Sequence, residues 1–426
     1  MDKSTNIKLL TSIARKNIWR NKSRSRTVIL SIMLGTIAGI FLCAMMQGMI
    51  NQKVKDSIYI ENGHLEIISP AYITNEDINS TFNVDSVDNI LNKYIGNEIA
   101  FTSDEIIIQS MAQTPRANAG VNLIGINPAK EKEISSLYTK ILPETGDYFE
   151  KETRLPEVII GQKLANDLKI RKDSHHSKII FTFTDIHGKL TYLSCRIGGI
   201  FKTSNTLFDG SKVFIKQEQL REATHIPNNE THLLKILLNN KMHPDQLKNI
   251  QDFKKELQTY FPHLKVLDIK ETAPDTYIYQ LVTLPMTFVT MFIIYLVIAF
   301  GIANTMTMAI MDRIRELGML RSIGMSKQQI RYLIMSETTI LTFIGAFIGI
   351  ILSSILVLIT SHTGLNIYGD AFESFGIDGR IYPSITIQLF IIIVSLVAIV
   401  GIVTSLSPIN KILKSKILDS TKGILS

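Results

Sequence analysis

Four long stretches of the sequence are apolar and almost free of charge, and they constrain the fold more than any other feature. They cover residues 28–50, 281–311, 333–360 and 385–407, and Glu337 is the only charged residue that they contain. A bilayer core about 30 Å thick requires roughly 20 apolar residues in helical form. Each stretch reaches that length, so the sequence predicts four transmembrane α-helices.

The positive charges beside these stretches predict their orientation. Residues 1–27 hold eight basic residues and one acidic residue, and residues 312–332 hold five basic and two acidic residues. The end of the chain, 408–426, holds four basic and one acidic residue, whereas the loop 361–384 holds one basic and three acidic residues. Cytoplasmic loops are enriched in Lys and Arg. Both termini and segment 312–332 are therefore expected in the cytoplasm, and the long segment 51–280 on the other side of the membrane.

The same asymmetry explains the formal net charge of +7. The predicted cytoplasmic segments carry a net charge of +13, and segment 51–280 carries a net charge of −3. Basic residues next to transmembrane helices attract anionic lipid headgroups. We therefore expect membrane lipid, and no nucleic acid, as the partner of the basic segments.

The fold class predicted is a membrane protein with four transmembrane α-helices and a large α+β extracytoplasmic domain between the first and second helices. The expected segments are a cytoplasmic amphipathic N-terminal segment (1–27), transmembrane helix 1 (28–50), the α+β domain (51–280), transmembrane helix 2 (281–311), a cytoplasmic coupling helix (312–332), transmembrane helix 3 (333–360), a short outer loop (361–384), transmembrane helix 4 (385–407) and a cytoplasmic tail (408–426). Within the large domain, residues 84–94 and 244–260 have the apolar periodicity of helices. Residues 178–185 and 190–201 have the pattern of the two strands of a hairpin.

The sequence lacks the motifs of several large enzyme classes. It contains no G-x-x-x-x-G-K-[ST] phosphate-binding loop, no H-E-x-x-H pair and no G-x-S-x-G elbow. Glu337 lies near one end of its apolar stretch, where an acidic side chain reaches water or a basic neighbour. We therefore expect no catalytic residue, no metal site and no directly bound cofactor.

The segment between the second and third apolar stretches has the pattern of a short amphipathic helix. Ile314 and Leu317 recur at helical spacing, and Gly324 is expected to end the helix. Ser326 followed by Gln329 predicts a capping box at the start of the next helix. The residues alone allow either an interfacial loop helix or a coupling helix that docks into a soluble partner.

This segment resembles the coupling region of the MacB/FtsX-type permeases of ABC transporters. The resemblance rests on R-x-R-E-L-G-M-L-R-S-I-G-M-S-x-x-Q-I at residues 313–330, and on A-R-K-N-I-W-R-N-K at residues 14–22, which is similar to the family's N-terminal amphipathic helix. The order of one span, a large outer domain and three further spans is also similar. G-H-L-E-I at residues 63–67 and the pattern of residues 199–215 look most like the lipoprotein-releasing, LolC/LolE-type subunits.

The resemblance implies a permease subunit of an ATP-driven, mechanotransmission-type ABC transporter in the bacterial inner (plasma) membrane, with domain 51–280 in the periplasm. It implies that the chain is no enzyme itself, because ATP is hydrolysed by a separate ABC ATPase dimer, and that a second permease copy, identical or paralogous, is present. The implied ATPase-coupling residues are Arg313, Arg315, Glu316, Gly318, Arg321, Gly324 and Met325. The implied substrate is a lipoprotein extracted from the inner membrane for the outer membrane, with a periplasmic lipoprotein carrier as a further partner.

The acyl chains of such a substrate require an apolar cavity, and adaptable Met side chains suit it. The candidate residues, on the outer halves of the first two spans, are Phe41, Met45, Met49, Met286 and Phe292. Ordinary packing or lipid contact is the alternative for each of them.

Two other functions fit the same residues. They are MacB-like efflux of an antibiotic, toxin or peptide, and transmembrane signalling to a periplasmic partner. Two G-x-x-x-G pairs, Gly35/Gly39 and Gly345/Gly349, favour close helix packing, either within the chain or between two copies.

Overall fold

The computed structural model divides the chain into two compact units. The membrane unit comprises residues 1–49, 281–365 and 381–426, and the outer unit comprises residues 50–280 and 366–380. The residues that the structure describes are 12–16, 18, 22–94, 98–143, 145–150, 154–170, 178–239, 247–367, 379–387, 390–396, 399 and 403.

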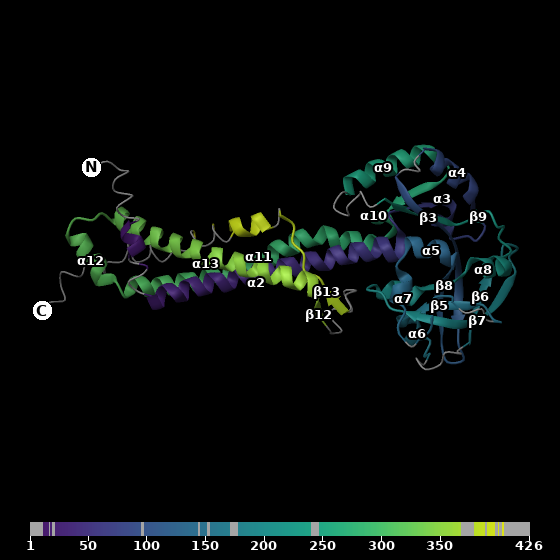
Figure 1. Cartoon of the computed structure of the whole chain (residues 1–426), viewed down its shortest axis with the longest axis horizontal. Coiled ribbons are helices and arrows are strands. Elements are labelled where there is room, and N and C mark those ends of the chain that lie inside the picture. Colours follow the sequence, from purple (N-terminus) through teal and green to yellow (C-terminus); the bar gives the residue numbers. More distant parts are fainter. Residues whose placement is uncertain are drawn as a thin grey trace. The chain divides into compact units, whose positions relative to one another are not determined.

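Among the described residues, three helices are long and apolar enough to cross a membrane. They are α2 (Lys22–Asp56), α11 (Pro274–Met311) and α13 (Lys327–Thr363), and they contain the first three predicted spans (Figure 1). Residues 390–396 of the fourth predicted span are also helical. Most of the remainder of that span, and the tail from residue 404, lie outside the described residues, so the count of four helices stays a prediction.

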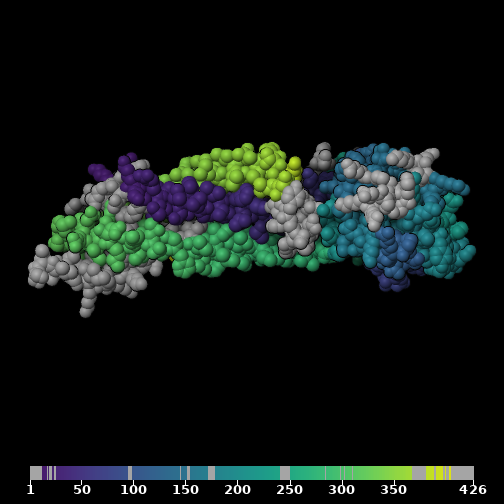
Figure 2. Space-filling view, turned by 90° about the horizontal axis from the view of Figure 1, so that it is seen from below, coloured from purple at the N-terminus to yellow at the C-terminus, as the bar shows by residue number. Residues whose placement is uncertain are grey.

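Close approach between α13 and α2 depends on the absence of two side chains. A Cβ atom added at Gly345 would lie 2.9 Å from a backbone oxygen of α2, and one added at Gly349 would lie 2.8 Å from Thr36 Cβ. Figure 2 shows α2 in purple beside the yellow-green part of α13. A Cβ at Gly39 would lie 3.6 Å from Met291 Cε, which is ordinary contact with α11. The Gly345/Gly349 pair therefore packs within the chain.

We predict that Gly349→Ala destabilises the membrane unit, because the added methyl group meets α2 at less than the contact distance of two carbon atoms. Overpacking of this kind typically costs about 1–3 kcal/mol. The control is Gly301→Ala in α11, where an added Cβ finds no atom of the described chain within 4 Å. The measurement is the midpoint of thermal unfolding of the full chain in detergent. Equal midpoints for the two variants would contradict the packing described.

The outer unit is built on one nine-stranded mixed sheet with the strand order β11-β1-β10-β3-β4-β8-β5-β7-β6. Its strands are β1 (Leu65–Ile68), β3 (Ile99–Gln113), β4 (Asn118–Ile126), β5 (Glu157–Gly161), β6 (Lys178–Thr184), β7 (Leu190–Phe201), β8 (Lys212–Lys216), β10 (Leu233–Leu238) and β11 (Lys265–Asp268). Two small two-stranded sheets pair β2 (Phe82–Asn83) with β9 (Glu230–Thr231), and β12 (Leu365–Ile367) with β13 (Gly379–Ile381). The β4–β8 and β5–β7 pairs are parallel. The α+β class predicted for this segment is confirmed, as is the β6–β7 hairpin.

Short helices accompany the sheet. They are η1 (Ser57–Asn62), α3 (Pro70–Asn75), α4 (Val84–Tyr94), α5 (Pro128–Ile134), η2 (Leu137–Lys140), α6 (Gln162–Asp167), α7 (Thr206–Ser211), α8 (Gln217–Thr224), α9 (Leu247–Tyr260) and α10 (Ile269–Thr272). The predicted helix at 84–94 is confirmed as α4. The predicted helix at 244–260 is observed from Leu247 onward, and residues 244–246 lie outside the described residues.

Strand β3 connects two lobes of the outer unit. Its residues 99–105 pair with β10, and its residues 106–113 pair with β4. One buried cluster contains Phe181 and side chains of β3 to β8, and another contains Leu234 with the apolar faces of α4 and α9. One continuous strand therefore belongs to both hydrophobic cores.

The first strand of the large sheet along the chain, β1, is hydrogen-bonded to its last strand, β11. β1 pairs with β11 in antiparallel fashion, with Leu65 opposite Asp268 and Ile68 opposite Lys265. Gly63 makes the turn into β1 with a φ angle of 75°, where a Cβ would lie 3.0 Å from Ile236 O. Glycine is favoured because it adopts positive φ without steric cost.

A cluster of charged residues is buried in this part of the sheet. Lys235 Nζ lies 2.5 Å from Glu105 Oε1 and 3.8 Å from Glu131 Oε1. Glu66 lies directly opposite Lys235 in the β1–β10 pair. Burial raises the pKa of Glu66 to about 8, because the charged form of a carboxyl group is disfavoured away from water, and Lys235 opposes this shift.

Candidate coupling surface

Helix α12 (Ile314–Ser322) connects α11 to α13, and the local sequence determines where it ends. Gly324 has a φ angle of 102°, and the N–H of Met325 donates a hydrogen bond to the carbonyl five residues earlier at 3.1 Å. Both are features of a glycine-terminated helix. Ser326 and Gln329 then form the reciprocal bonds of a capping box at the start of α13. The predicted helix stop and capping box are both confirmed.

Arg313, just before α12, forms a buried ion pair with Glu337 of α13. Its Nη1 lies 3.1 and 3.2 Å from the two carboxylate oxygens of Glu337. Arg313 is 8% exposed and Glu337 is 3% exposed. The Arg313 Nε also lies 3.8 Å from Glu316 Oε2. This arrangement ties the residue that precedes α12 to the first third of α13, and gives Glu337 a basic neighbour.

Two large apolar side chains at the other side of α12 are exposed to solvent. Met319 is 60% exposed and Ile323 is 83% exposed, although both side chains are large and apolar. Arg315 is also exposed, whereas Leu317 and Gly318 are buried. We call Arg315, Met319 and Ile323 the coupling surface.

The seven residues predicted to couple to an ATPase differ in their exposure. Arg315 and Gly324 are exposed, Glu316, Arg321 and Met325 are half-buried, and Arg313 and Gly318 are buried. Their role stays a prediction, but Arg313 is bonded to Glu337 inside the chain, so its guanidinium is not on the coupling surface. Sequence reasoning assigned no docking role to Met319 and Ile323, although their four-residue spacing places them on one helix face.

We predict that Arg313→Met destabilises the chain by about 3–5 kcal/mol, because the variant leaves Glu337 buried without its partner. The double variant Arg313→Met/Glu337→Met should recover much of that loss, because it replaces the ion pair by apolar contacts. Thermal unfolding of the full chain in detergent measures both effects, with the exposed Arg315→Met as the control. The single variant Glu337→Met is measured in the same way. A double variant whose loss of stability equals the sum of the losses of Arg313→Met and Glu337→Met would contradict this description.

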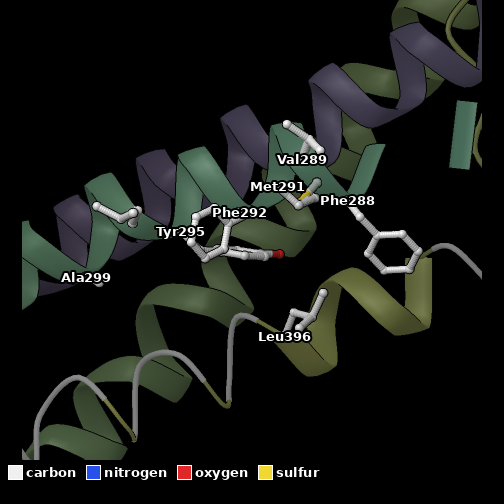
Figure 3. Close-up of a pocket in the computed structure, with 8 residues that line it drawn as sticks. Phe288, Val289, Met291, Phe292, Tyr295, Ala299 and Leu396 are labelled. Atoms are coloured by element: carbon white, nitrogen blue, oxygen red, sulfur yellow. The ribbon is translucent and has the colours of Figure 1, made fainter. Parts of the chain in front are cut away.

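An apolar cavity of ≈ 620 Å³ lies between α11 and the helical residues 390–396 (Figure 3). The Tyr295 hydroxyl donates a hydrogen bond to Ile393 O at 3.0 Å, which joins the two walls. The lining residues are Phe288, Val289, Met291, Phe292, Tyr295, Leu296, Ala299 and Leu396.

Of the five residues predicted for an acyl-chain cavity, Phe292 lines this one. Met286 is 53% exposed on the same helix, and Phe41, Met45 and Met49 are half-buried on α2. This cavity is formed by residues of α11 together with Leu396. The predicted role of the five residues stays a prediction.

Comparison with protein families gives a match over residues 288–417 to the family described as "FtsX-like permease C-terminal". The matched region begins in α11, includes α12 and α13, and extends into the C-terminal residues. It therefore contains the coupling surface, the Arg313–Glu337 pair and the cavity beside Phe292.

Three related proteins have informative names. The "Uncharacterized ABC transporter permease MJ1507" of Methanocaldococcus jannaschii is 22% identical over 84% of this chain and 85% of its own length. The "Lipoprotein-releasing system transmembrane protein LolC" of Buchnera aphidicola is 23% identical over 77% of each chain. The "ABC transporter permease YtrF" of Bacillus subtilis is 29% identical, and the match spans 29% of its length.

Two solved structures are similar to part of the chain. The extracellular domain of the ABC-type transporter YknZ from Gram-positive bacteria matches 48% of this chain and 99% of its own, with 13% identity and a TM-score of 0.31. The periplasmic region of MacB from Actinobacillus actinomycetemcomitans matches 52% of this chain and 97% of its own, with 11% identity and a TM-score of 0.33.

Proposed function

We propose that this chain is the membrane subunit of a transporter driven by a separate ABC ATPase dimer, because its residues 288–417 match the FtsX-like permease family and its relatives include ABC transporter permeases. We further propose that it works with a second permease copy and extracts lipoproteins from the inner membrane for delivery to the outer membrane. Both termini would lie in the cytoplasm and the outer unit in the periplasm.

The observation that supports the ATPase partnership is the construction of α12. Its outward face exposes Met319 and Ile323 beside Arg315, while Arg313 on the other side is bonded to Glu337. A partner that displaces the coupling surface would therefore pull on α13 through a buried ion pair. Because Gly345 and Gly349 bring α13 into close contact with α2, the displacement would reach a second long helix.

We predict that Met319→Asp/Ile323→Asp reduces the amount of ATPase that co-purifies with the affinity-tagged full chain by at least about tenfold, since burying either carboxylate in a docked interface would cost several kcal/mol. The control is Gln328→Asp, an exposed position of the same cytoplasmic segment that lies outside α12. The ATPase is identified by mass spectrometry and quantified against the permease. If the double variant recovers as much ATPase as the wild-type chain, the coupling surface is not the ATPase docking site.

Two observations support a lipoprotein substrate. LolC, which is named as a component of a lipoprotein-releasing system, aligns with this chain over 77% of its length. The cavity beside Phe292 is wholly lined by apolar and aromatic side chains, and its ≈ 620 Å³ is comparable to the volume of small-molecule sites. Such a lining suits the acyl part of a lipid-modified protein.

We predict that depletion of this protein strands lipoproteins in the inner membrane. The measurement separates inner and outer membranes after depletion and quantifies lipoproteins in each fraction, with re-expression of the intact chain as the control. Normal sorting under strong depletion would reject lipoprotein release. The remaining functions would then be efflux of a small molecule or peptide and signalling to a periplasmic partner. The proposed ATPase partnership would be unaffected by this result.

A further inference from the structure

A second cavity, of ≈ 400 Å³, lies within the outer unit where its first and last helical segments meet. Its walls come from the end of α2, from α7 and the residue before it, and from the first turns of α11. Its lining includes Lys53, Asn205, Leu207, Asp275, Ile278 and Tyr279.

The sequence places this cavity at the level of the lipid headgroups. Lys53 follows the apolar stretch 28–50 by three residues, and Tyr279 precedes the apolar stretch 281–311 by two residues. Three residues of helix rise about 4.5 Å. Tyr and Lys are the residues that occupy the membrane–water interface, because each has an apolar body and a polar end.

The cavity carries one positive and one negative side chain. Lys53 Nζ lies 4.0 Å from the centroid of the Tyr279 ring, which holds the ammonium group over the ring face. Asp275 lies on the same side of the unit, four residues before Tyr279 and thus one helical turn away. Burial lowers the pKa of Lys53, and the carboxylates of Glu61 and Asp275 oppose that shift. A ligand with a net negative charge in the cavity would meet the Asp275 carboxylate as well as the lysine.

Hydrogen bonds hold the α7 wall in place. Asn205 Oδ1 accepts bonds from the N–H groups of Leu207 and Phe208 at 3.1 and 3.3 Å. Its Nδ2 donates to both carboxylate oxygens of Glu61 at 3.1 Å. Ser204 Oγ donates to Asp56 Oδ2 at 2.5 Å. The wall is therefore attached to α2 and η1 at two points, so the cavity is formed before any ligand arrives.

The rim of the cavity is apolar and exposed. Leu207 is 70% exposed and Ile278 is 56% exposed. At the edge of a bilayer, such side chains contact the glycerol and the first acyl carbons of a lipid rather than water.

We propose that this cavity binds the headgroup of a zwitterionic phospholipid of the phosphoethanolamine type. The phosphate lies toward Lys53, the ammonium group lies toward Asp275, and the glycerol backbone lies against Leu207 and Ile278. The paired charges of the cavity match the paired charges of this headgroup, whereas an anionic headgroup has no positive group to place beside the Asp275 carboxylate. This site is distinct from a lipoprotein site, because a lipid-modified cysteine carries no phosphate.

The test is native mass spectrometry of the purified full chain, titrated with phosphatidylethanolamine and with phosphatidylglycerol of the same acyl composition. We expect the wild-type chain to retain phosphatidylethanolamine in preference, and Lys53→Met to weaken its binding about tenfold, the loss typical of one hydrogen bond to a charged group. The matched control is Lys270→Met, because Lys270 Nζ also lies over a tyrosine ring, 5.1 Å from the Tyr277 centroid, but outside the cavity. Equal losses in the two lysine variants would overturn the proposal.

Asp275→Asn provides the second arm, since it keeps the shape of the side chain and removes its charge. We expect this variant to shift the preference toward phosphatidylglycerol, and an unchanged preference would overturn the proposal even if Lys53→Met failed to fold. Displacement of phosphatidylethanolamine by a diacylated lipopeptide without phosphate would also overturn it, in favour of a substrate site. No ATPase is present in this assay, so its result is separate from that of the depletion experiment.

Discussion

The buried pair of Arg313 and Glu337 is the interaction on which the membrane half of this molecule depends. Two charges removed from water are costly, and they are tolerated because each satisfies the other at 3.1 Å. The pair joins the residue between α11 and α12 to Glu337 of α13. A short helix held only by Leu317 would be free to roll on its neighbours, but a charge-assisted bond has a direction. That direction leaves Met319 and Ile323 facing outward.

The contacts beyond this pair are stiff, because they are made by backbone and by small residues. Gly345 and Gly349 of α13 lie directly against backbone oxygens and β-carbons of α2. Helix α2 continues without interruption to Asp56, six residues past its apolar stretch. Long helices in direct contact transmit displacement better than helices joined through flexible side chains. The membrane unit therefore has the parts that a mechanical relay needs.

Several features were predictable from sequence because they depend on near neighbours in the chain. The three described spans follow from apolar stretches that are almost free of charge. The end of α12 follows from Gly324, and the start of α13 follows from the Ser326–Gln329 pair. The partner of Arg313 lies 24 residues away, and only the folded helix pair brings Glu337 to it. The cavity beside Phe292 includes Leu396, a residue about 100 positions away that no local pattern connects with α11. Hydrophobicity indicates which helices enter a membrane, and it carries little information about which of them become neighbours.

The pairing of β1 with β11 has a consequence for the history of such proteins. The two connections of the outer unit to the membrane helices are hydrogen-bonded to each other, with Leu65 opposite Asp268. A module whose entrance and exit adjoin occupies no more room between two helices than a short loop would. Such a module can be enlarged, trimmed or exchanged for another while the helices that carry it keep their spacing. The architecture therefore allows the outer unit and the membrane helices to change separately.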